Sequence, residues 1–283
     1  MNVASLSNTD MPASESLILS VQDLDISFGP HHVLTGINLQ VPRGQTLAII
    51  GESGCGKTVL LKTLIRLIDP TSGTVLFDGQ DLSQLDIHEL SRQRTRFGFI
   101  FQQAALFDSM TIGQNVAFPL LQHTQLSEEE VHQRVLNQLA DVGLPDSVLD
   151  KKPAELSGGM RKRVGVARAL MLNPELVLYD EPTTGLDPIV SDVINELILR
   201  SRRRYCVTSI IVTHDMRTAR KVADRIVMLY PTSRLVAGES QIIFDGPPSE
   251  LDRTEDSRVV QFVRGEAGER LMEMRSEASM ADY

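Results

Sequence analysis

The most constraining feature of the sequence is the segment GESGCGKT at residues 51–58, which has the glycine, lysine and threonine spacing of a phosphate-binding loop. An apolar run at residues 46–50 precedes it, and the apolar residues that follow recur at helical spacing as far as Asp69. Glycine lets the backbone pass close to a phosphate, so that successive N–H groups face the anion. The segment therefore predicts a nucleoside triphosphate site between a buried parallel strand and a helix, in an α/β fold.

Each position of this loop has an expected contact. The Lys57 ammonium is predicted to bridge the β- and γ-phosphates, and the Thr58 hydroxyl is predicted to bind Mg²⁺. The other positions are predicted to contact the phosphates through the backbone, and they are Gly51, Glu52, Ser53, Gly54, Cys55 and Gly56. Because Cys55 lies inside the loop, we also expect alkylation of its thiol to block nucleotide binding, and bound nucleotide to protect it.

Two adjacent carboxylates, Asp180 and Glu181, end an apolar run at residues 176–179 that predicts a buried strand. Open α/β sheets bind their ligands at this carboxyl edge. Asp180 is predicted to bind Mg²⁺, and Glu181 to orient the attacking water and accept its proton. Such a pair is more often a surface feature when it occurs alone, and the phosphate loop upstream favours the catalytic interpretation.

A third segment, Ser157-Gly158-Gly159, stands at the start of a predicted helix. Free N–H groups at a helix start bind anions, so this segment is a second candidate phosphate site. An ordinary helix cap is the alternative for the segment in isolation. Its place between the phosphate loop and the carboxylate pair favours the anion site.

In this order and spacing the three segments resemble the Walker A, signature and Walker B motifs of the ABC-type ATPases, over about residues 18–250. Phe28 then resembles the aromatic residue that stacks on adenine, Gln102 the Q-loop glutamine, and His214 the switch histidine that contacts the γ-phosphate. Residues 185–187 resemble the D-loop of the family. Each of these matches, taken alone, has an ordinary structural explanation. Their occurrence together in the expected order favours the resemblance to the ABC-type ATPases.

The resemblance implies an α/β fold of the P-loop NTPase class, with a RecA-like core, an antiparallel β subdomain and a helical signature subdomain. It implies an ATPase domain at residues 18–265 and a helical subdomain at about residues 104–160. Short tails are expected at residues 1–17 and 266–283. Within the helical subdomain, Ser127 and Glu130 have the spacing of a capping box for an amphipathic helix.

The same resemblance implies an ATPase that uses ATP and Mg²⁺. The catalytic residues would be Glu181, His214 and Gln102, and the metal would be bound by Thr58, Gln102 and Asp180. In this family a site is completed across a dimer, with Ser157, Gly158 and Gly159 of one copy facing the phosphate loop of another. We therefore expect a homodimer, or a heterodimer with a relative, that encloses two ATP molecules.

The signature segment also resembles a narrower group. Met160 replaces the usual glutamine, and residues 156–163 are similar to the ATPase of the Mla-type phospholipid transport systems, which serve outer-membrane lipid asymmetry. Residues 105–107, 115–120 and 123–126 resemble the same group, in a region where relatives contact a permease. This implies ATP-driven dimer closure on a transmembrane, MlaE-like permease, with phospholipid handled by the complex. Substrate-binding and small accessory subunits are candidate further partners.

Composition narrows the remaining choices. The net charge of −9 disfavours nucleic acid as a partner. No apolar run reaches the roughly 18 residues that cross a bilayer, and no export signal is recognisable. The two cysteines suit a reducing compartment, with the cytoplasm as the default. The resemblance to the transport ATPases then implies a peripheral subunit at the cytoplasmic face of the inner membrane. Two alternatives stay open: an ABC ATPase for another transported substrate, and a soluble regulatory ABC ATPase without a permease.

Overall fold

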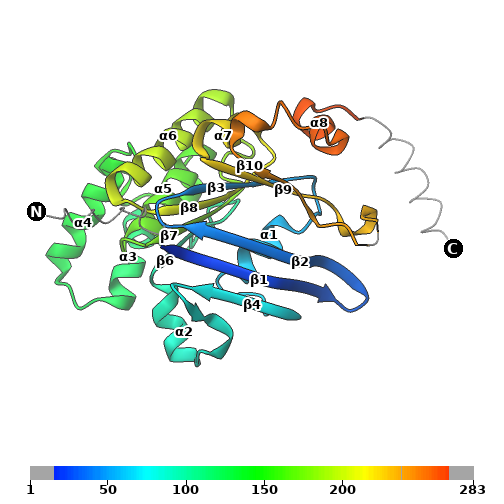
Figure 1. The fold of residues 1–283 in the computed structure, drawn as a ribbon. Coiled ribbons are helices and arrows are strands. Elements are labelled where there is room, and N and C mark those ends of the chain that lie inside the picture. The colour runs from blue at the N-terminus through cyan, green and yellow to red at the C-terminus, as the bar shows by residue number, and fades with distance from the viewer. Residues whose placement is uncertain (1–15, 237, 268–283) are drawn as a thin grey trace, which may run out of the picture.

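The computed structural model describes residues 16–236 and 238–267 and arranges them in two β-sheets with helices around them (Figure 1). The smaller sheet has the order β2-β1-β4-β5 and is antiparallel in every pair. Its strands are β1 (Leu17–Phe28), β2 (His31–Pro42), β4 (Ser72–Phe77) and β5 (Gln80–Asp81). Leu17 belongs to β1 and pairs with Pro42, so the predicted N-terminal tail extends one residue too far. Residues 1–15 of that tail, and residues 268–283 of the C-terminal one, lie outside the described residues.

The larger sheet has the order β10-β9-β3-β8-β7-β6, and all its pairs are parallel except β10 with β9. Its strands are β3 (Thr46–Ile50), β6 (Phe97–Ile100), β7 (Leu176–Asp180), β8 (Thr208–Val212), β9 (Arg225–Leu229) and β10 (Ile242–Gly246). Strands β3, β7 and β8 are buried along their whole length, because layers cover both faces of the sheet. The predicted α/β fold with a separate antiparallel sheet is confirmed.

The smaller sheet and one short helix cover one face of the larger sheet, and most of the helices cover the other (Figure 1). Eight α-helices lie within the described residues. They are α1 (Lys57–Thr63), α2 (Ile87–Arg94), α3 (Ile112–His123), α4 (Glu128–Asp141), α5 (Gly158–Leu170), α6 (Pro188–Tyr205), α7 (Met216–Val222) and α8 (Ser257–Arg264). In the part of the chain that the structure describes, none of them is long and apolar enough to cross a bilayer.

Alternating residues of the central strands bury against different layers. Leu47 and Ile49 of β3 pack with the smaller sheet and α1, whereas Ala48 and Ile50 pack with α7 and α8. Strand β7 alternates in the same way, with its other face against α3, α4, α5 and α6. Since successive strand residues point to opposite faces, the continuous apolar runs serve two cores at once.

The helix after the phosphate loop is shorter than its apolar spacing predicts. It ends at Thr63, and Arg66 adopts a left-handed backbone conformation with φ of 54°. Arg94 of α2 donates from Nε to the Ile65 carbonyl (3.0 Å) and from Nη2 to the Arg66 carbonyl (2.6 Å). A side chain from another helix therefore satisfies carbonyls that a continuing helix would have used.

The capping box predicted in the helical segment is confirmed at the start of α4. Ser127 Oγ accepts from the Glu130 N–H (3.3 Å), and Glu130 Oε2 accepts from the Ser127 N–H (2.9 Å). Helices α3 and α4 share one apolar core with α5 and α6. The limits of the helical subdomain and of the ATPase domain stay predictions.

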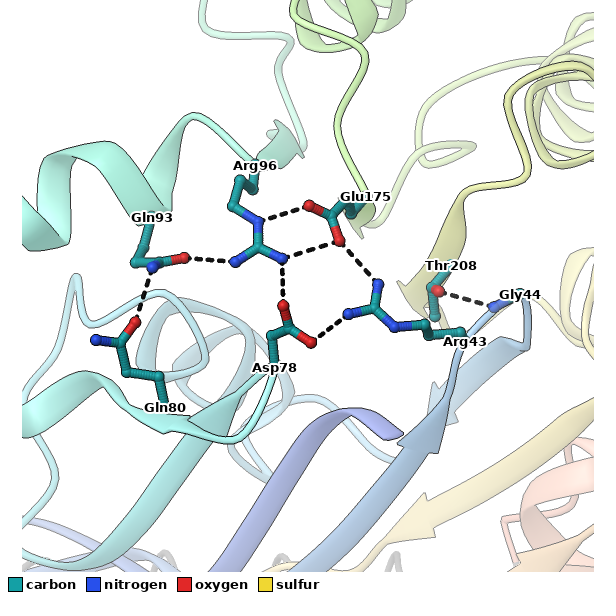
Figure 2. Close-up of polar contacts among 8 residues, drawn as sticks. All are labelled: Arg43, Gly44, Asp78, Gln80, Gln93, Arg96, Glu175 and Thr208. Carbon is teal, nitrogen blue, oxygen red and sulfur yellow. Dashed lines mark hydrogen bonds and ion pairs between the residues drawn. The ribbon is translucent and has the colours of Figure 1, made fainter. Parts of the chain in front are cut away.

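An ion-pair network joins the smaller sheet to the amino ends of the parallel strands (Figure 2). Arg96 donates to Glu175 Oε1 (2.6 Å) and to Asp78 Oδ2 (2.6 Å), and Arg43 donates to Glu175 Oε2 (2.8 Å) and pairs with Asp78. Hydrogen bonds from Arg96, and then from Arg43, hold the pKa of both carboxyls below the usual range. The network lies at the amino ends of the strands, so it ties the two sheets together away from the carboxyl edge.

We predict that Glu175→Gln lowers the free energy of unfolding by about 1–2 kcal/mol. Arg43 and Arg96 both lose the charge of the Glu175 carboxylate, which solvent only partly screens. The contribution is present above about pH 4 and is lost as the pH falls through the lowered folded pKa values. Urea unfolding at pH 7 checks the size of the effect. Asp69→Asn, in the exposed pair with Arg66, is the matched control and should change stability by less than about 0.5 kcal/mol.

Candidate nucleotide site

The phosphate loop follows β3 and needs glycine at two positions. Gly51 has φ of +144°, and a Cβ there would lie 2.3 Å from the Leu229 carbonyl oxygen. Gly56 has φ of +95°, and a Cβ there would lie 2.7 Å from a methyl carbon of Leu34. Both the backbone conformation and the close neighbours exclude a side chain, so the loop can keep its course only with glycine.

The loop folds around the side chain of Lys57. Lys57 Nζ donates to the Gly51 carbonyl (2.8 Å) and the Glu52 carbonyl (2.7 Å), and the side chain is buried. Ser53 and Gly54, at the tip, are exposed. A buried ammonium held inside a loop with an exposed tip places positive charge where the sequence predicts phosphate.

The two predicted metal ligands meet although they lie far apart in the sequence. Thr58 Oγ1 donates to Asp180 Oδ1 at 2.8 Å, because α1 starts beside the carboxyl end of β7. Burial raises the pKa of the Asp180 carboxyl above its usual value. One hydroxyl and one carboxylate are hard oxygen donors that suit Mg²⁺, which takes few protein ligands and keeps oxygens from phosphate or water. The residues present therefore fit the predicted ion.

The predicted base lies beside the predicted switch histidine. Glu181 Oε2 is 2.8 Å from His214 Nδ1 and accepts a hydrogen bond from Thr184 Oγ1 (2.8 Å). The Glu181 N–H donates to the Val212 carbonyl at the end of β8, which fixes the turn after β7. An ionised carboxylate only accepts hydrogen bonds. To make this contact, a neutral His214 must therefore carry its ring proton on Nδ1. Neighbouring parallel strands thus bring the two residues together at one sheet edge.

Lys162 is a site residue that the sequence analysis missed. It belongs to α5, is 7% exposed, and donates from Nζ to the Thr184 carbonyl (2.6 Å) and the Glu181 carbonyl (3.2 Å). Burial lowers the pKa of its ammonium to about 8, against an opposing effect of the Glu181 charge. Lys162 stands between Arg161 and Arg163, and such basic runs are usually solvated, so nothing in the sequence indicates a buried lysine here.

We predict that the stability of the protein rises between pH 8 and pH 10 through Lys162. Below about pH 8 the buried Lys162 ammonium is charged, and its burial lowers the free energy of unfolding. The folded chain loses this proton at a lower pH than the unfolded chain, so the free energy of unfolding rises above about pH 8. Lys162→Met should therefore remove about 2 kcal/mol of the pH-dependent change between pH 7 and pH 9.5. Urea unfolding of both proteins at the two pH values measures it. Equal pH dependence in both would contradict the assignment.

The signature segment forms the start of α5. Ser157 is the N-cap and accepts from the Met160 N–H (3.3 Å), and both Ser157 and Gly158 are exposed. A Cβ on Gly159 would lie 2.5 Å from Val190 Cγ1, so glycine allows α5 to approach α6 closely. Among the described residues, no hydrogen bond joins this segment to the phosphate loop of the same chain. Ser157 and Gly158 are open to contact with a second molecule, whereas Gly159 is buried.

Gln102, the third predicted metal ligand, lies beside the signature and D-loop segments. It is exposed after β6 and lines a hollow of about 680 Å³ together with Gly158, Lys162, Thr184 and Leu186. Among the described residues it makes no hydrogen bond to Thr58 or Asp180. The structure thus brings Gln102 to the signature and D-loop segments, and its metal role stays a prediction.

Phe28 ends β1 and is 51% exposed, so one face of its ring can receive a flat base. The hairpin that carries it continues into β2, where Val33 lies 3.1 Å from the position of a Cβ on Gly56. The predicted base-stacking hairpin and the phosphate loop are therefore neighbours. Arg234 follows Thr232, which bonds to the His32 carbonyl of β2, and it pairs with Glu52 of the loop at 2.6 Å. No sequence pattern predicted this contact.

The expectation for Cys55 is wrong. Its side chain is 1% exposed, and burial raises the pKa of its thiol despite the nearby Lys57 ammonium. A buried and protonated thiol reacts slowly, because the thiolate is the nucleophile. Glycine-rich spacing located the residue in the loop, but it did not show that the side chain points into the core.

We predict instead that iodoacetamide modifies the exposed Cys206 and spares Cys55 in the native chain. Cys55 should react at least about 100-fold more slowly, because reaction needs a local opening that costs about 3 kcal/mol or more. Intact-mass measurement of the Cys206→Ser variant, which keeps Cys55 as the only thiol, checks this with and without denaturant. Rapid labelling of that variant in native buffer would contradict the burial.

The comparisons with known proteins agree with this geometry. A family model described as ABC transporter matches residues 34–184. The phospholipid transport ATP-binding protein MlaF of Haemophilus influenzae is 40% identical over 88% of this chain and 91% of its own length. A probable ribonucleotide transport ATP-binding protein, mkl, of Mycobacterium tuberculosis is 39% identical over 93% of this chain and 72% of its own length. The dimeric cassette MJ0796, solved with ADP and phosphate after hydrolysis, has a TM-score of 0.72 and 32% identity, covering 81% of this chain and 98% of its own.

Proposed function

Because the chain belongs to the ABC transporter family and is an ATPase of that family, we propose that it hydrolyses ATP to drive phospholipid transport through a membrane permease. The observation that carries the substrate class is the 40% identity to a phospholipid transport ATPase over nearly the whole of both chains. The geometry at the carboxyl edge of the sheet supports the hydrolysis.

In this proposal the chain's own residues position ATP and the attacking water. Lys57 leaves its loop carbonyls to bind the phosphates. Thr58 and Asp180 would hold Mg²⁺, whose charge would offset that of the phosphates. Glu181 accepts the proton of the water, and His214 holds the carboxylate of Glu181 in place. Most of the acceleration comes from positioning and charge neutralisation.

The exposed signature segment supports assembly with a second copy. Ser157 and Gly158 are exposed at the start of α5, and the solved relative MJ0796 is dimeric. We propose that Ser157, Gly158 and Gly159 complete the site of the partner, so that two ATP molecules lie between two chains and draw them together.

A groove beside α3 supports a permease partner. It encloses about 480 Å³ and presents aromatic rings, with Phe107 and Phe118 4.9 Å apart and the Arg168 guanidinium 5.7 Å from the Phe107 ring. Phe107 is exposed although it is large and apolar, which is typical of a contact surface. A short helix of a transmembrane partner fits a groove of this kind.

Localisation follows from that partner. We propose that the chain binds the cytoplasmic face of the inner membrane through the permease, with substrate-binding and small accessory subunits as candidate members of the complex. A ribonucleotide substrate is the second candidate, because the mycobacterial relative carries that description at nearly the same identity.

Purification of the tagged chain from membranes in mild detergent tests the proposal. We expect a polytopic protein and bound phospholipid to copurify, and mass spectrometry to identify both. Phe107→Asp should lose the polytopic protein and keep ATP binding, since the groove is separate from the phosphate loop. A fully soluble chain without a membrane partner would contradict transport. A bound ribonucleotide other than ATP or ADP, without lipid, would favour the second substrate.

A further inference from the structure

The side chain of Gln241 links three segments that lie far apart in the sequence. Its Oε1 accepts from the Thr35 N–H (2.9 Å), and its Nε2 donates to the Val33 carbonyl (3.1 Å) and the Cys55 carbonyl (3.1 Å). The residue is 1% exposed and lies just before β10. Every hydrogen of the carboxamide is therefore used inside the protein, at a point where β2 meets the phosphate loop.

The bond to Cys55 fixes the direction of a peptide unit in the phosphate loop. The carbonyl of one residue and the N–H of the next lie in one plane and point in opposite directions across a trans peptide. Since Gln241 holds the Cys55 carbonyl toward the core, the Gly56 N–H points the other way. Among the described residues no hydrogen bond accepts that N–H.

We propose that Gln241 is a positioning residue for the nucleotide, which holds the Cys55–Gly56 peptide so that the Gly56 N–H faces a bound phosphate. The inference rests on the proposed function, because it takes ATP as the ligand of this loop. Gln241 also anchors β2 at Val33 and Thr35, and β2 pairs with the strand that ends at Phe28. One carboxamide thus sets the phosphate loop against the hairpin expected to stack on the base.

Asn115 is a suitable control, because it is a buried amide whose hydrogen bonds are all local. It is fully buried, and its side chain bonds to the backbone of Phe107, Met110 and Thr111, all within eight residues. It lies in α3, on the helical side of the molecule. Asn115→Asp and Gln241→Glu make the same chemical change, from an amide that donates to a carboxylate that does not.

The experiment measures the dissociation constant of ATP for the full chain, with the melting temperature of each variant as a stability control. We expect Gln241→Glu to weaken ATP binding by about tenfold or more. The new carboxylate oxygen would face the Val33 and Cys55 carbonyls and could not donate to them, so the Cys55–Gly56 peptide would lose its hydrogen bond. Gln241→Met, which has a similar length and no charge, should fold more readily and weaken binding by about threefold or more. Asn115→Asp should lower the melting temperature and keep the ATP affinity.

The outcomes separate the inference from the proposed function. Weaker binding in both Gln241 variants, with unchanged affinity in Asn115→Asp, supports the positioning role. Wild-type affinity in Gln241→Met overturns the inference and leaves ATP binding standing, and so does equal weakening in Asn115→Asp. A wild-type chain that binds no ATP overturns the proposed function and the inference with it.

Discussion

Replacing Glu181 by glutamine is expected to reduce ATP hydrolysis by about 10²–10⁴-fold while ATP binding persists. Glutamine has the same shape and can still accept from Thr184 Oγ1, but it cannot take the proton of the attacking water. The phosphate loop is unchanged, so we also expect ATP to trap the closed dimer. Phosphate release and ATP binding by the purified complex, with size-exclusion chromatography of the chain, measure the three effects.

The matched control for this prediction is Glu196→Gln. Glu196 is an exposed carboxylate of α6 that pairs with Lys221, and it takes part in no predicted contact with ATP. Its replacement should leave the hydrolysis rate within about twofold, as expected for a surface substitution. Near wild-type hydrolysis by Glu181→Gln would show that Glu181 is not the base.

Replacing Lys57 by alanine is expected to weaken ATP binding by about 100-fold or more. Each charge-assisted hydrogen bond to a phosphate contributes about 1.5–3 kcal/mol, and Lys57 is predicted to bridge two phosphates. The variant also loses the bonds that hold the Gly51 and Glu52 carbonyls, so the empty loop should lose order. Equilibrium titration with ATP measures the affinity.

Lys151→Ala is the corresponding control, because Lys151 precedes the signature segment and contributes no predicted contact with the phosphates. Its affinity for ATP should match that of the wild type. If Lys57→Ala also binds ATP normally, the loop at residues 51–58 is not the phosphate site. Lys57→Ala thus tests ATP binding, and Glu181→Gln tests the chemical step.

Local patterns were sufficient where a contact depends on neighbouring residues. The capping box at Ser127 and Glu130 and the buried strands β3, β7 and β8 all follow from spacing and apolar content. Contacts across the sheet needed the structure. The bond between Thr58 and Asp180 and the pair of Glu181 with His214 depend on which strands are neighbours.

The errors have the same origin. The apolar residues after Lys57 continue at helical spacing, yet α1 stops at Thr63, because Arg94 of α2 binds the following carbonyls. Cys55 has the sequence position of an accessible loop residue, but the fold turns its side chain into the core. In both places a distant segment overrides a correct local pattern.

The sequence by itself determined the kind of ligand and the fold class, because a phosphate loop needs glycine, lysine and threonine at fixed positions and buried parallel strands need continuous apolar runs. The tertiary structure alone decided which distant groups serve that loop. Gln241 and Arg234 reach the loop from segments without a recognisable motif. Their contacts depend on how the sheets and helices pack. Hydrogen bonds between residues more than a hundred positions apart produce no periodic pattern in the sequence from which they could be predicted.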